Sequence, residues 1–168
     1  MTPVPTRRVS LRAAGAACLA LLLAACAAPR PPVPPGVPHW SGRFSLTIHH
    51  EPAERWSAGF DLQGSAAEGA LLVHSPLGQQ LAALRWSPRG AELQQGGQRL
   101  QRPSLDALSG ELAGGSALPV AALFEWLQGR QAPASGWEAD LSQQPEGRLV
   151  ARRHHPLPTA ELRVVFEP

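Results

Sequence analysis

The histidines and serines are the side chains best suited to metal binding or nucleophilic chemistry. Four of the six histidines form the pairs His49-His50 and His154-His155. Adjacent residues on a strand point to opposite faces of a sheet, so neither pair is expected to hold one metal ion. A zinc site would need ligands from distant strands, because carboxylates are scattered along the chain. We therefore predict solvated surface histidines and no metal site.

Nucleophilic catalysis lacks its usual residues as well. No Gly-x-Ser-x-Gly motif occurs, and Ser75 stands beside Pro76, a combination typical of a turn. The sequence contains no lysine, which excludes a P-loop, a Schiff-base lysine and a Ser-x-x-Lys acylation site. Because no catalytic constellation is present, we expect a protein that is not an enzyme and that needs no cofactor.

Cys26 is the reactive residue with the most informative surroundings. Three arginines lie among the first twelve residues, and an uncharged apolar run, residues 13–25, leads from them to Cys26. A membrane-crossing helix needs about 20 apolar residues, whereas a short apolar run behind a basic segment is the layout of a cleaved secretory signal. Leu23-Ala24-Ala25-Cys26 resembles the lipobox of bacterial lipoproteins. This resemblance implies that residues 1–25 are removed and that Cys26 carries a diacylglycerol and an N-acyl chain.

The same segment predicts where the protein resides. Ala27 follows Cys26 where lipoproteins of the inner membrane typically have Asp, so the resemblance implies a lipid-anchored protein on the periplasmic face of the outer membrane. Each buried methylene of an acyl chain contributes about 0.8 kcal/mol, and several chains together hold a protein firmly. The other cysteine, Cys18, lies within the signal, which leaves the mature domain without a thiol for a disulfide.

Charge argues against a nucleic-acid partner. The whole chain has a formal net charge of +2, with 15 basic and 13 acidic residues. Removal of residues 1–25 takes away three arginines and no acidic residue, which leaves a net charge of −1. Since no basic stripe remains, we expect no binding to DNA or RNA.

The mature chain divides into a tether and one domain. Residues 26–38 follow the signal and contain six prolines, which favour extended polyproline II. Residues 39–168 have a normal size for a domain with one core. Short segments that alternate apolar and polar residues predict strands at 40–48, 56–62, 70–74, 80–86, 91–94, 137–141, 148–151 and 161–166.

Turn clusters rich in Gly, Pro and Ser separate these strands, which predicts an antiparallel meander that curls into an open sheet or barrel. The alternation places Trp56 on the apolar face with Phe60 and Leu62. Two helices are predicted at residues 105–112, with Ser104 as the N-cap, and 120–127, between Pro119 and Gly129. The fold class is therefore α+β and mainly β.

The order of segments resembles the LolB family of outer-membrane lipoproteins. The resemblance rests on Gly42-Arg-Phe, the stretch at residues 72–82, the helix at residues 119–129, and Gly136-Trp137. It implies an unclosed, curved antiparallel barrel covered by helices around an apolar cavity. It also implies a function: an acceptor that takes lipoproteins from a LolA-like periplasmic carrier, binds their acyl chains, and inserts them into the outer membrane.

The resemblance also assigns residues. It implies that Leu77, presented by Pro76 and Gly78, is the apolar tip of a loop that acts on the membrane during delivery. The helical wall of the cavity is assigned to Leu123, Phe124, Trp126 and Leu127, and the sheet wall to Phe44, Leu46, Phe60, Leu62 and Trp86. A solid core would have the same sequence pattern, so a hollow and a filled interior both remain open.

Two other functions fit parts of the sequence. A periplasmic shuttle of related fold would bind lipoproteins too, but the lipobox argues against a mobile carrier. A structural lipoprotein would use its apolar face to bind a membrane-protein assembly. One segment, Gly129-Arg-Gln-Ala-Pro133, is longer than the turn expected in the family. In every case we expect a monomer that works without an energy source.

Overall fold

The computed structural model describes residues 35–112 and 119–167. The predicted signal, Cys26 and most of the tether lie outside these described residues. The strands are β1 (His39–His49), β2 (Glu54–Gly64), β3 (Gly69–His74), β4 (Gln80–Ser87), β5 (Gly90–Gln95), β6 (Gln98–Arg102), β7 (Trp137–Asp140), β8 (Arg148–Arg153) and β9 (Thr159–Phe166). The helices are α2 (Leu105–Leu112), α3 (Val120–Leu127) and the 3-10 turn η2 (Gln144–Glu146).

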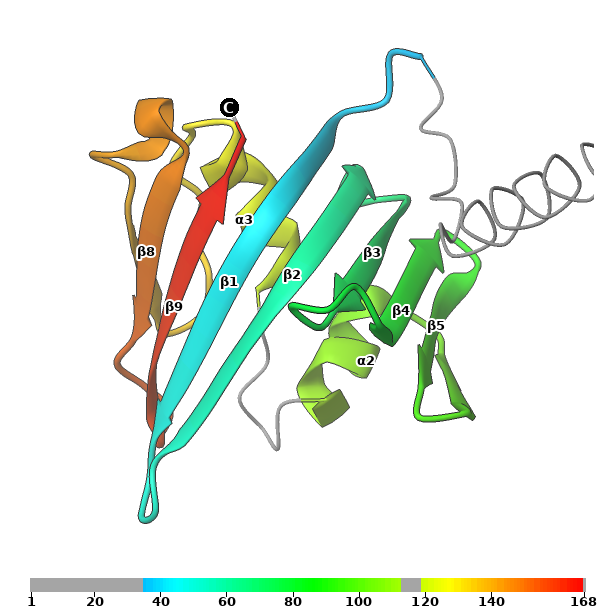
Figure 1. Cartoon of the computed structure of the whole chain (residues 1–168), viewed down its shortest axis with the longest axis horizontal. Coiled ribbons are helices and arrows are strands. Elements are labelled where there is room, and N and C mark those ends of the chain that lie inside the picture. The colour runs from blue at the N-terminus through cyan, green and yellow to red at the C-terminus, as the bar shows by residue number, and fades with distance from the viewer. Residues whose placement is uncertain (1–34, 113–118, 168) are drawn as a thin grey trace, which may run out of the picture. The chain divides into compact units, whose positions relative to one another are not determined.

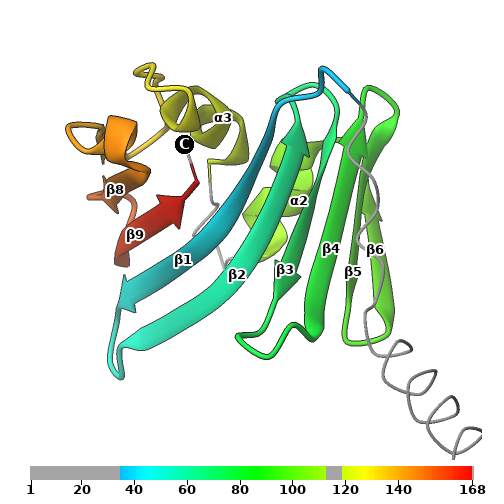
Figure 2. The same cartoon turned by 45° about the horizontal axis from the view of Figure 1, so that its top comes forward.

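The nine strands form one antiparallel sheet in the order β6-β5-β4-β3-β2-β1-β9-β8-β7 (Figure 1). The chain builds the meander β1 to β6 first, and its last strand, β9, then returns to pair with β1. Leu46 at the centre of the sheet lies opposite Trp56 of β2 and Leu162 of β9. Strands β6 and β7 are the two free edges, so the sheet is unclosed, as predicted. Figure 2 shows that the sheet is also curved.

Both helices begin and end where the sequence predicted them. The Ser104 side-chain oxygen accepts a hydrogen bond from the Ala107 amide (3.1 Å), which satisfies a free donor at the start of α2. Gly129, with φ +76°, follows α3 in the left-handed region that favours glycine. Neither helix is long and apolar enough to cross a membrane, and this holds throughout the described ranges.

Three features differ from the sequence prediction. Strand β6 was missed because Gln98–Arg102 contains one apolar residue, Leu100, which leaves no period-2 pattern to read. The 3-10 turn η2 was also missed. Trp56 was predicted to face the core but is 59% exposed. The reason is that pairing between β2 and β3 begins only at Gly59, opposite His74, so β3 does not extend alongside Trp56.

Candidate functional site

Helix α3 supplies the apolar side chains predicted for the helical wall. Phe124, Trp126 and Leu127 are fully or almost fully buried, and Leu123 packs partly buried beside them. The Trp126 indole N–H donates to the Ala132 carbonyl (3.3 Å), so the ring is buried with its polar group satisfied. The helix therefore turns a face of large rings and branched side chains toward the sheet.

The sheet bends around Phe124. The Phe124 ring meets Trp40 of β1 with centroids 5.8 Å apart, and Trp86 of β4 at 5.9 Å, both edge to face. Strands in a flat sheet lie about 4.8 Å apart, so β1 and β4 would be separated by roughly 14 Å. One ring contacts side chains from two strands that are not neighbours, as expected on the concave side of a curved sheet. The α3 side of the sheet is therefore the inner face.

The residues predicted for the sheet wall lie on this inner face. Leu46, Phe60, Leu62 and Trp86 are buried, and Phe44 is partly buried with its ring centroid 6.5 Å from that of Phe60. Together with the α3 residues they belong to a single apolar cluster. The structure thus gathers all nine predicted residues, but it packs them against one another instead of arranging them around a continuous void.

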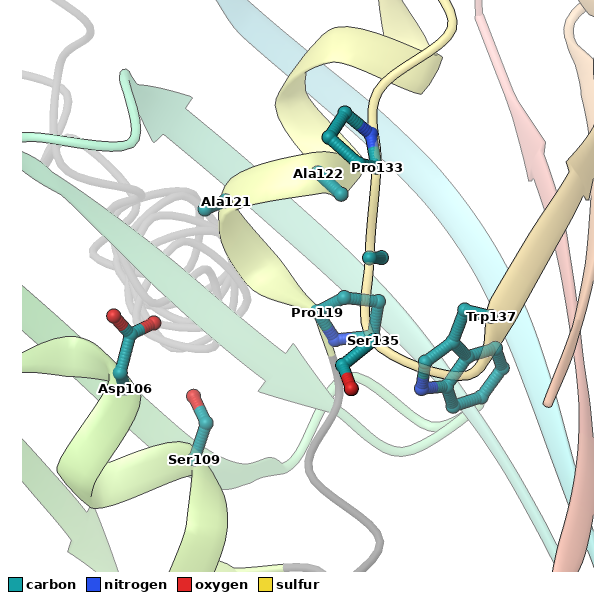
Figure 3. Close-up of a pocket in the computed structure, with 9 residues that line it drawn as sticks. Asp106, Ser109, Pro119, Ala121, Ala122, Pro133, Ser135 and Trp137 are labelled. Atoms are coloured by element: carbon teal, nitrogen blue, oxygen red, sulfur yellow. The ribbon is translucent and has the colours of Figure 1, made fainter. Parts of the chain in front are cut away.

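Two pockets open beside this cluster. The first, of about 260 Å³, lies between α2, α3 and the segment before β7, where Pro119, Ala121, Pro133 and Trp137 line it together with Asp106 (Figure 3). Asp106 and Ser109 project toward this space from α2 (Figure 3). The pocket is smaller than the roughly 300–1,000 Å³ typical of ligand sites.

The second pocket, of about 230 Å³, lies on the other side of the same helix ends. It is lined mainly by small residues and prolines of the β2–β3 turn, the β4–β5 turn and the start of α2. Asp106 and Ala121 line both pockets, so these two side chains separate them. Of the predicted cavity residues only Trp86 reaches either pocket. Sequence reasoning missed the other lining residues because most of them are alanines, prolines and serines, which form no apolar stripe.

The β3–β4 turn presents Leu77 to solvent, as predicted. The Ser75 amide donates to the Gln79 carbonyl (2.8 Å), and the Gly78 amide donates to the Ser75 carbonyl (2.9 Å). Gly78 has φ +80°, a conformation that costs other residues backbone strain. Leu77 is 96% exposed at the tip of this tight turn. Its side chain is therefore held away from the protein.

The longer segment after α3 is fixed by polar contacts. Arg130 bonds to Glu125 (2.6 Å), and this hydrogen bond lowers the pKa of the Glu125 carboxyl. The Gln131 side chain donates to the Ala139 carbonyl, and the Gln144 side chain donates to the Leu127 carbonyl (3.1 and 2.8 Å). The C-terminal end of α3 is thus tied to β7 and η2.

The histidine pairs play no part in the apolar site. His49, His50, His154 and His155 are exposed, as the sequence predicted. In residues 35–112 and 119–167 no three histidine, cysteine, aspartate or glutamate side chains come together as metal ligands would.

Comparison with known proteins gives a consistent result. The sequence model of the family described as "Outer membrane lipoprotein LolB" matches residues 39–157. The chain is 36% identical over 153 residues to the outer-membrane lipoprotein LolB of Cupriavidus pinatubonensis, which covers 86% of this chain and 71% of the relative. The chain is 34% identical to the outer-membrane lipoprotein LolB of Bordetella petrii over 170 residues, which cover 84% of this chain and 84% of the relative. The identity to the outer-membrane lipoprotein LolB of Azoarcus sp. is 32% over 161 residues, which cover 80% of this chain and 81% of the relative.

Proposed function

Because this chain belongs to the LolB family of outer-membrane lipoproteins, we propose that it accepts lipoproteins at the outer membrane and passes their acyl chains into the bilayer. The family description is that of a lipoprotein and names no catalytic activity, which agrees with the prediction that the chain is not an enzyme. Residues 1–25 serve as the signal, Cys26 carries the lipid anchor, residues 26–38 form the tether, and residues 39–168 bind cargo.

The observation that carries this proposal is the apolar cluster between α3 and the inner face of the sheet. It offers rings and branched side chains from α3 and from several strands that belong to different parts of the chain. Pockets lie on both sides of the ends of α2 and α3, where only Asp106 and Ala121 separate them.

We propose that acyl chains enter at these pockets and join them into one cavity as α3 moves away from the sheet. The nine predicted residues within the cluster would then line the cavity and contact the acyl chains instead of one another. The apolar surface that is buried from water changes little when side chains exchange protein contacts for contacts with acyl chains. Binding therefore needs no energy source. Transfer runs downhill, since each 1.4 kcal/mol of preference for the next site shifts the equilibrium about tenfold.

Delivery would use the Leu77 turn. A leucine held away from the protein costs little when it enters lipid, because no protein contact is lost. The cargo would arrive with its acyl chains shielded by a periplasmic carrier of the LolA type. Leu77 would then contact the outer membrane while the acyl chains leave the cavity.

The test is mass spectrometry of acyl chains that co-purify with the Cys26→Ala form from cells that make lipoproteins. This variant carries no lipid of its own, so any diacylglyceryl peptide found with it occupies a binding site. We expect acylated N-terminal peptides of several lipoproteins. Recovery of a membrane-protein assembly without acylated peptides would instead favour a structural role and contradict the proposal.

A further inference from the structure

One end of the sheet collects most of the exposed large apolar side chains. The turns β1–β2, β3–β4, β5–β6 and β8–β9 lie at the same end, because the strands are antiparallel and follow the observed order (Figures 1 and 2). Five large apolar side chains are exposed among the described residues, and four lie at this end: Trp56, Leu77, Leu81 and Leu157. We call this the turn end. The fifth, Val165, lies toward the other end of β9.

The turn end contains two turns that each expose a leucine. Leu77 stands between Pro76 and Gly78, and Leu157 stands between Pro156 and Pro158. Leu157 is 81% exposed, close to the 96% of Leu77. The Leu77 turn has no ionisable residue between its strands, and the Leu157 turn has two histidines, of which His154 lies 3.7 Å from the Glu138 carboxylate. Only Leu77 was identified from the sequence.

Several contacts hold the Leu157 turn in place. The buried Arg153 guanidinium donates a hydrogen bond to the Pro158 carbonyl and lies over the Trp137 ring, 5.9 Å from its centroid. The His154 amide donates to the Gly136 carbonyl (2.9 Å). The two backbones approach so closely that a Cβ on Gly136 would lie 1.5 Å from the His155 carbonyl oxygen. The exposure of Leu157 is therefore built into the fold, on a turn that packs against the wall of the first pocket.

We propose that Leu157 enters the lipid bilayer together with Leu77, so that the turn end meets the membrane at two points. This inference rests on the proposed function of the Leu77 turn. The occupant is a bilayer surface, because the protein is anchored to one and because each turn exposes a leucine with no carboxylate or arginine between its two strands. Trp56, 59% exposed at the same end, is the residue type favoured at the membrane interface. Two points of contact restrict the tilt of the domain to rotation about the line that joins them, whereas one point leaves the domain free to tilt in every direction.

Depth-dependent fluorescence quenching tests the proposal. The mature chain has no thiol besides Cys26, which its lipid occupies, so Leu157→Cys, Leu77→Cys and Val165→Cys each accept one environment-sensitive dye. The lipidated full chain is reconstituted into phosphatidylethanolamine and phosphatidylglycerol vesicles that contain spin-labelled acyl chains. We expect loss of fluorescence for the dyes at positions 77 and 157, and none for position 165.

The other outcomes separate the inference from the proposed function. Quenching at 77 without quenching at 157 overturns the two-point contact and leaves the proposed function standing. Quenching at neither position removes the membrane role of both turns. Equal quenching at all three positions also overturns the inference, because contact would then not be confined to the turn end.

Discussion

The inner face and the turn end place the same kinds of side chain in opposite situations. On the inner face Phe124 and Trp126 are buried against other apolar groups of the protein. At the turn end Leu77 and Leu157 are 96% and 81% exposed on rigid turns. Apolar groups that already have partners can exchange them for an acyl chain, whereas exposed groups gain their first apolar partner from lipid. The contrast assigns cargo binding to one region and membrane contact to the other.

The largest expected effect comes from removing a ring of the inner face. Trp126 is fully buried, so Trp126→Ala should lower the free energy of unfolding by about 3–5 kcal/mol, through lost transfer energy and a cavity. Urea unfolding measures this change. Trp56→Ala is the matched control and should change stability by no more than about 0.5 kcal/mol. Equal effects of the two substitutions would remove the distinction between the two regions.

A charge at the turn end should affect delivery and not folding. Leu77→Glu removes a side chain whose burial in lipid contributes about 1.5–3 kcal/mol, so delivery of cargo to liposomes should fall about tenfold to a hundredfold. Acceptance of cargo and urea unfolding should stay unchanged. The control is Val165→Glu, at an exposed position away from the turn end. Normal delivery by the Leu77 variant would contradict the proposed membrane role.

A bulky residue between the two pockets should block the inner face selectively. Ala121 is exposed and lines both pockets, so Ala121→Phe should fill the entrance without disturbing the core. We expect acceptance of acylated cargo to weaken about tenfold, equivalent to about 1.4 kcal/mol. A pull-down of carrier-bound cargo measures it. If acceptance is unchanged, acyl chains do not enter at these pockets.

The smallest effect concerns an exposed ion pair on β8 and β9, in the strands next to the turn end. Arg163 and Arg152 donate to the two carboxylate oxygens of Glu161 (2.7 and 3.0 Å), and these bonds lower the pKa of Glu161 below its ordinary value of 4.5. The contribution to stability is therefore complete above pH 4.5 and is lost as the pH falls through the lower pKa of the folded state. At neutral pH Glu161→Gln should cost about 0.5 kcal/mol, because the group is partly exposed and screened.

Urea unfolding as a function of pH checks this prediction. The difference in stability between the wild type and the Glu161→Gln variant should shrink as the pH falls below 4.5 and disappear in stronger acid. A difference that grows toward acid would contradict the assigned direction of the pKa shift.

The sequence predicted those elements whose local signals agree with their burial. Ser104 and Gly129 mark helix ends by backbone chemistry that acts within a few residues, so both helices were located correctly. Strand β6 lacked such a signal, because an exposed edge strand needs no alternating apolar residues. Trp56 was misplaced because its exposure depends on how far β3 extends alongside β2, which is a property of the pairing and not of the strand.

The site was predictable only in part for the same reason. The nine cluster residues were identified because buried apolar side chains repeat at regular spacing, and Leu77 because a Pro-Leu-Gly turn resembles a known feature of the family. Leu157 gave no such signal: a single leucine between prolines has no periodicity. Whether the interior is open depends on the fit between α3 and the sheet, and no local pattern encodes that fit.

The most direct test of acyl-chain binding is photo-crosslinking from the inner face during transfer. A photoreactive amino acid at Leu123, which is partly buried beside the cluster, is offered carrier-bound acylated cargo, with Val165 as the control position. We predict a crosslink to the acyl chains at position 123 and none at 165, and no crosslink when the cargo lacks its lipid. Crosslinks at position 123 that form equally well with unacylated cargo would contradict acyl-chain binding on the inner face. The absence of any crosslink at position 123, while cargo still reaches the membrane, would contradict it as well.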